Sequence, residues 1–84
     1  MSKISKLHAW IVANPRASIP FRDFERLVVA FGFSPIRQLG SHRLYARPDV
    51  RFVVNIQPRG KEAKSYQIQQ FLAMCDQYGL KLDD

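Results

Sequence analysis

The chain has 84 residues, of which 46% are hydrophobic and 24% charged, and its formal net charge is +6. This balance is typical of a small folded domain and excludes a disordered segment. The strong positive charge implies an anionic partner, with nucleic acid first and an acidic protein second. Because the basic residues are spread along the chain, a cationic helix that binds a membrane surface is disfavoured.

The cysteine count, the histidine spacing and the hydropathy pattern argue against a disulfide-linked, metal-binding, membrane-spanning or secreted protein. The single cysteine, Cys75, cannot form an intramolecular disulfide, and its helical context predicts a small buried residue. His8 and His42 lie far apart, and no close Cys/His spacing indicates a metal site. No apolar run approaches the roughly 18 residues that span a bilayer, and the N-terminus lacks the apolar core of a secretory signal. We therefore expect a cytoplasmic protein without metal or cofactor.

Two helices are predicted in the first part of the chain. From about Ser2 to Ala13 an apolar stripe recurs at helical spacing, formed by Ile4, Leu7 and Ile11. Trp10 stands beside this stripe and is expected in the core, whereas His8 is expected at the surface. The second helix runs from about Pro20 to Phe31, where Pro20 suits the first turn. Its apolar stripe consists of Phe21, Phe24, Leu27, Val28 and Phe31, and Gly32 follows as a left-handed C-cap.

Three strands are predicted next. Residues 33–39 contain Pro35, which suits an edge strand, and Gly40-Ser41 indicates a turn. Residues 42–47 and 51–57 alternate apolar and polar side chains, as half-buried strands do. In the first of these runs Leu44 and Ala46 fall on one side, and Arg43, Tyr45 and Arg47 fall on the other.

A loop over residues 58–64 and a last helix from Ser65 to about Tyr78 complete the chain, with Ser65 as a plausible N-cap. The element order α, α, β, β, β, α predicts an α+β two-layer sandwich, in which helices cover one sheet face and leave the other open. We expect a single domain over residues 1–84, divided into a helical extension (1–19) and a core (20–82).

His42 is the candidate base, because histidine is the residue type whose ordinary pKa lies closest to neutrality. The small turn Gly40-Ser41 before it lets a large ligand approach the ring. The alternative is a structural histidine that caps the strand or is half-buried with Leu44, whose side of the strand it shares. If the Leu44 side faces the helices, His42 escapes burial only at the rim.

Basic residues near the last helix and on the strands are candidate RNA contacts. The loop carries Arg59, Lys61 and Lys64 and leads into a helix N-terminus, which favours phosphate, although most basic loops are merely solvated. We expect strand arginines to line the open face, among them Arg37, Arg43, Arg47 and Arg51. Tyr45 is expected to stack on a base or supply a hydroxyl there, and the alternative is an ordinary charged surface with one tyrosine. Asn55 and Gln57 share one side of the last strand and could hydrogen-bond RNA or a protein.

Several segments together resemble the HicA family of bacterial toxins over roughly residues 21–82. They are Phe24 to Gly32, the run Arg37-Gln38-Leu39-Gly40-Ser41-His42-Arg43-Leu44-Tyr45, Val53 to Ile56, Gly60-Lys61-Glu62 and the final Gly79-Leu80. The resemblance implies an α-β-β-β-α fold like that of double-stranded-RNA-binding domains. It also implies an mRNA-cleaving toxin that is neutralised by a HicB-type antitoxin.

By the same resemblance His42 is the catalytic residue, Gly40 and Ser41 form the turn that positions it, and Lys61 contacts RNA. The chain departs from short family members by its additional N-terminal helix and by a segment, Gln57-Pro58-Arg59, that lacks a second histidine. We therefore expect a metal-independent cleavage in which His42 activates an RNA 2′-hydroxyl and the general acid is unassigned. Two alternatives remain: a non-catalytic RNA-binding module, and an inactive toxin-like subunit that only binds protein.

Overall fold

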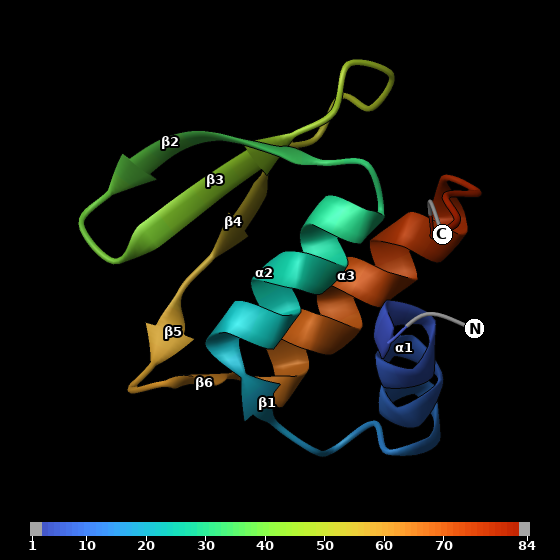
Figure 1. The fold of residues 1–84 in the computed structure, drawn as a ribbon. Helices are drawn as coiled ribbons and strands as arrows, with labels where there is room; N and C mark the ends of the chain where they lie inside the picture. Colours follow the sequence, from blue (N-terminus) through green and yellow to red (C-terminus); the bar gives the residue numbers. More distant parts are fainter. Residues whose placement is uncertain (1–2, 83–84) are drawn as a thin grey trace.

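The fold is taken from a computed structural model, which describes residues 3–82. Short strands join the helices along this part of the chain, and most of them follow one another between the second and the last helix (Figure 1). In chain order they are α1 (Lys3–Ala13), β1 (Ile19–Pro20), α2 (Phe21–Ala30), β2 (Ser34–Leu39), β3 (His42–Ala46), β4 (Val54–Ile56), β5 (Pro58–Arg59), β6 (Glu62–Ala63) and α3 (Ser65–Gln77). None of the helices within residues 3–82 is long and apolar enough to cross a membrane.

Helix α1 packs on the rest of the chain along a narrow stripe. Ile11 is buried, and Ile4 and Leu7 pack against the core, as predicted. The expectation that Trp10 is buried is wrong, because its side chain lies beside this stripe and is 48% exposed. His8 is half-buried instead of lying at the surface, with its ring edge-on to Phe31 at 5.5 Å between centroids.

Helix α2 is strongly amphipathic and supplies much of the core through its predicted apolar stripe. It ends where Gly32 adopts a left-handed conformation, with φ +92°, which confirms the predicted C-cap. A Cβ at Gly32 would lie 2.9 Å from Nη1 of Arg47, so this position is constrained by space as well as by φ. Helix α3 also begins as predicted, but Lys64 occupies the N-cap position and Ser65 is the first helical residue, so Ser65 does not act as the cap.

The three predicted strands are present as β2, β3 and β4, which pair antiparallel in that order. The third strand is shorter than expected and begins at Val54. Phe52 lies outside the ladder, and its ring packs against Phe33 and Tyr78, with centroid separations of 5.7 and 5.1 Å. Aromatic contacts are therefore present at this end of the sheet where the expected strand pairing is absent.

The predicted loop over residues 58–64 contains a second small sheet. Strands β5 and β6 pair around a turn at Gly60, whose φ is +62°, and β6 also pairs with β1. The backbone N–H of Phe21 donates to the carbonyl of Lys61 at 2.8 Å. The turn that carries Lys61 is thereby attached to the N-terminal end of α2.

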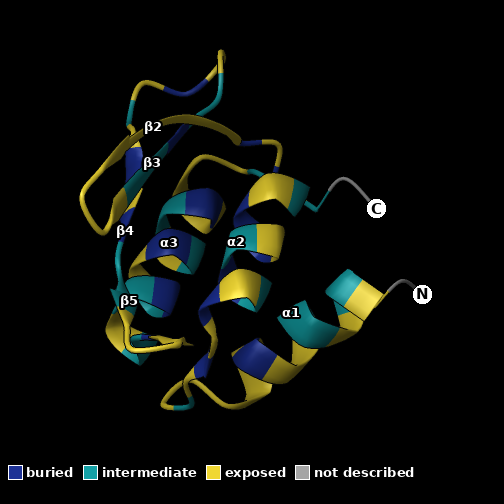
Figure 2. Cartoon of the chain, turned by 60° about the vertical axis from the view of Figure 1, so that its left-hand side comes forward, coloured by how far each residue is buried: buried dark blue, intermediate teal, exposed yellow. Residues whose placement is uncertain are grey.

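The helices lie on one side of the β2–β3–β4 sheet and leave the other side open, which confirms the predicted α+β architecture (Figures 1 and 2). Buried residues recur along α2 and α3, whereas the β2–β3 hairpin is largely exposed (Figure 2). The covered face carries Tyr45, Val54 and Ile56, all of them buried. Because side chains alternate along a strand, Leu44 and His42 belong to the open face.

Candidate functional site

The histidine stands at the first position of β3 and is exposed. A two-residue turn joins β2 to β3, and Gly40 at its first position has φ +60°, which fits the tight hairpin turns that need glycine there. Leu39 and His42 are paired at the end of the ladder. His42 is therefore not buried with Leu44 under the helices. The Leu44 side of β3 faces away from the helices and leaves His42 accessible.

Two amides from the neighbouring strand region hold the histidine and its turn. Oδ1 of Asn55 lies 3.0 Å from Nδ1 of His42, and Nε2 of Gln57 donates to Oγ of Ser41 at 3.1 Å. The backbone N–H of Gln57 in turn donates to Oε1 of Gln67 on α3, at 3.3 Å. The sequence placed Asn55 and Gln57 on one side of a strand, but it did not assign them to His42.

A partly buried polar cluster anchors β3 from the opposite face. Nη1 of Arg43 lies 2.8 Å from both carboxylate oxygens of Glu25, and the Tyr45 hydroxyl donates to Oε2 of the same residue at 2.6 Å. The Arg43 guanidinium also lies over the ring of Phe21, 5.3 Å from its centroid. Burial, and to a smaller extent the hydrogen bond to Glu25, raises the pKa of Tyr45 to about 12. The hydrogen bond to the same carboxylate raises the pKa of Arg43.

This cluster corrects two expectations. Tyr45 is only 5% exposed and lies under the sheet, so it is not available to stack on a base at the open face. Arg43 also points to the helix side, where it is bound to Glu25. Both residues therefore fix the strand that carries His42.

The open face carries fewer of the strand arginines than the sequence predicts. Arg37 is exposed and pairs with Leu44, so it lies on the face of His42. Arg47 instead turns to Asp49 and the carbonyl of Phe31, and the hydrogen bond lowers the pKa of Asp49. Exposed apolar side chains from Leu39 and Val53 border the face as well.

The hairpin of β5 and β6 divides the predicted basic loop between two hollows. Lys61 lines an open hollow of about 370 Å³ at the start of α2, together with Arg22 and Arg43. Arg59 and Lys64 line another of about 410 Å³ at the start of α3. No signal in the sequence linked Arg22 to Lys61.

Residues 21–80 match a family model described as the HicA toxin of bacterial toxin-antitoxin. The matched region contains α2, the complete β2–β3–β4 sheet, the His42 turn, the β5–β6 hairpin and α3. The chain belongs to the HicA toxin family. No curated protein and no solved structure matches it. The family match confirms the resemblance seen in the sequence and identifies the chain as a toxin of a bacterial toxin–antitoxin system.

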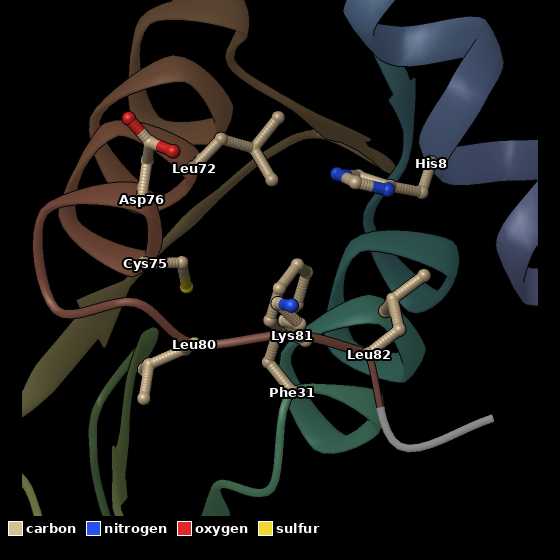
Figure 3. A pocket seen from close by; sticks show the side chains of 8 residues that line it. All are labelled: His8, Phe31, Leu72, Cys75, Asp76, Leu80, Lys81 and Leu82. Carbon is tan, nitrogen blue, oxygen red and sulfur yellow. The ribbon is translucent and has the colours of Figure 1, made fainter.

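The additional helix of this HicA-family toxin creates a separate hollow of about 220 Å³ between α1, α2, α3 and residues 80–82 (Figure 3). His8 enters it from α1, while Leu72, Cys75 and Asp76 line it from α3 (Figure 3). Burial raises the pKa of the Cys75 thiol to about 12. The hollow lies on the helix side of the molecule and includes none of the predicted site residues. Within residues 3–82 no group of three or more His, Cys, Asp or Glu side chains is arranged to hold a metal ion.

Proposed function

We propose that this HicA-family toxin is an endoribonuclease that cleaves mRNA and thereby stops translation, with His42 as its general base. The observation that carries the proposal is the setting of His42, which is exposed on the open face while Nδ1 contacts Asn55. That arrangement leaves the other ring nitrogen, Nε2, for a substrate proton. A histidine that merely capped the strand would need neither the open face nor the amide partner.

The reaction proceeds by attack of the RNA on itself. His42 removes the proton of a 2′-hydroxyl, whose oxygen then forms a bond to the adjacent phosphorus in line with the leaving oxygen. The bond from phosphorus to the 5′ oxygen breaks, and that oxygen takes a proton from solvent. One product ends in a 2′,3′-cyclic phosphate and the other begins with a 5′-hydroxyl. DNA lacks the 2′-hydroxyl and is therefore not cleaved.

Cations would bind the RNA backbone, and a cation on the face of His42 would stabilise the charge that develops at phosphorus. Lys61 lines a hollow beside Arg43, on the side of β3 opposite to His42, and would there contact backbone phosphates of the RNA. Arg59 and Lys64 extend the basic surface to the start of α3, and Arg37 contributes on the open face. The reaction requires no metal, because a general base and cationic side chains suffice for attack by the 2′-hydroxyl.

A HicB-type antitoxin would neutralise the toxin by covering the open face and burying His42. The exposed apolar side chains of Leu39 and Val53 next to this face, at 52% and 49% exposure, give such a partner more than charge to bind. The toxin would act in the cytoplasm, where mRNA and the antitoxin are present.

Inducible expression in bacteria tests the function. We expect the wild type to arrest growth and His42→Ala to permit it, at matched expression and thermal stability. Gln70→Ala changes an exposed residue of α3 and serves as the control, which we expect to arrest growth like the wild type. Arrest by His42→Ala at the wild-type level would instead favour toxicity through RNA or protein binding alone.

A further inference from the structure

Asn55 fixes the chemical state of the histidine on which the proposed function rests. A neutral imidazole carries its proton on one nitrogen and offers a lone pair on the other. Only the form protonated at Nδ1 leaves Nε2 free to act as a base. The contact at Nδ1 therefore decides whether His42 is competent in its neutral form.

The contacting atom is the amide oxygen of Asn55, 3.0 Å from Nδ1. An amide oxygen only accepts hydrogen bonds, so the proton between the two atoms must belong to Nδ1. We propose that Asn55 is a positioning residue that holds His42 in its Nδ1-protonated form and presents Nε2 to the substrate.

The fold holds this pair in place from both strands. Asn55 lies between Val54 and Ile56, which are 3% and 2% exposed, so its backbone is fixed by the core. It faces Leu44 in the register of β3 and β4, two positions along from His42 on the same face. The amide therefore reaches the ring along the diagonal of the sheet without distortion of either strand.

The turn before His42 is fixed as well. Gln57 donates to the Ser41 hydroxyl, and Gln38 donates to the Gly40 carbonyl at 3.2 Å. Arg43 anchors the next position to Glu25 on the opposite face. With the backbone of His42 restrained on both sides, the remaining freedom is the rotation and tautomer of the ring, and Asn55 restricts both.

Nitrogen NMR of the neutral imidazole tests the proposal without any assay of activity. We expect the His42 ring, identified by its loss in His42→Ala, to carry its proton on Nδ1 in the wild type. In Asn55→Ala both tautomers should be populated, while the His8 signals stay unchanged. A wild-type ring protonated on Nε2, or a tautomer unaffected by Asn55→Ala, would overturn the proposal even if the protein cleaves no RNA.

The pH profile of RNA cleavage supplies the second measurement. Asn55→Ala should lower kcat by roughly tenfold, the loss of about one hydrogen bond. Asn55→Asp keeps the acceptor but adds a charge that favours the imidazolium, so the acidic limb of the profile should move up by about one pH unit. Gln70→Ala is the matched control and should change neither quantity. An unmoved acidic limb in Asn55→Asp, in a folded variant, would contradict the role of Asn55, whereas absence of cleavage in every variant would contradict the proposed function alone.

Discussion

Neighbouring residues of β3 have different roles, because their side chains lie on opposite faces of the sheet. His42 faces the open side and is held by Asn55, whereas Arg43 and Tyr45 reach the helix side and bind Glu25. The alternation of the strand was readable in the sequence, but which side the helices cover was not. Tyr45 was expected at the open face, because a tyrosine among arginines is typical of a nucleic-acid surface.

The buried hydroxyl of Tyr45 predicts a pH dependence of stability. The ordinary tyrosine pKa is 10.0 and the folded value is about 12, so the folded state retains a proton that the unfolded state loses between these values. The contribution of Tyr45 is thus complete below pH 10 and is lost as the pH rises toward 12. Tyr45→Phe should lower the free energy of unfolding at pH 7 by about 1–2 kcal/mol and weaken its decline above pH 10.

Urea denaturation at pH 7 and between pH 9 and 11 measures both effects. Tyr66→Phe is the matched control, since Tyr66 is 54% exposed and should behave like the wild type. An identical alkaline decline in the wild type and in Tyr45→Phe would show that the hydroxyl is not held as described.

At the scale of elements, the long periodic segments were predictable and the short ones were not. The stripe of α2 and the alternation in β3 gave correct elements, because each repeats its pattern over several turns or residues. Strands β1, β5 and β6 have two residues each, too few for any alternation to appear. The sequence showed the cations of this segment. It did not show the hairpin that divides them between two hollows.

The additional helix α1 lies outside the family match, yet its packing predicts that it stabilises the toxin. Ile11 is 1% exposed, so Ile11→Ala should lower the free energy of unfolding by about 2–5 kcal/mol through lost burial and a residual cavity. Its neighbour Val12 is 60% exposed, and Val12→Ala should be nearly neutral. Chemical denaturation of the two variants makes the comparison, and equal stabilities would indicate that α1 does not contribute to the core.

The whole molecule combines a covered sheet face, which provides stability, with an open face that carries His42 (Figure 1). Its fold class and toxin family followed from the sequence, since the Gly-Ser-His turn and the Gly-Lys-Glu segment lie at family spacing. The contact between Asn55 and His42 could not be predicted from the sequence. Asn55 is 13 residues away and meets the ring only through the register of β3 and β4. The same holds for Arg22 and Lys61, which are brought together by the pairing of β1 with β6.

The ends of the cleaved RNA show most directly whether His42 activates a 2′-hydroxyl. Purified toxin is incubated with a single-stranded RNA in excess chelator, and the ends of the fragments are identified by mass spectrometry. We expect a 2′,3′-cyclic phosphate and a 5′-hydroxyl, no cleavage where the attacking 2′-hydroxyl is replaced by hydrogen, and no cleavage by His42→Ala. Unchanged cleavage by His42→Ala, or complete loss of wild-type cleavage in chelator, would contradict it.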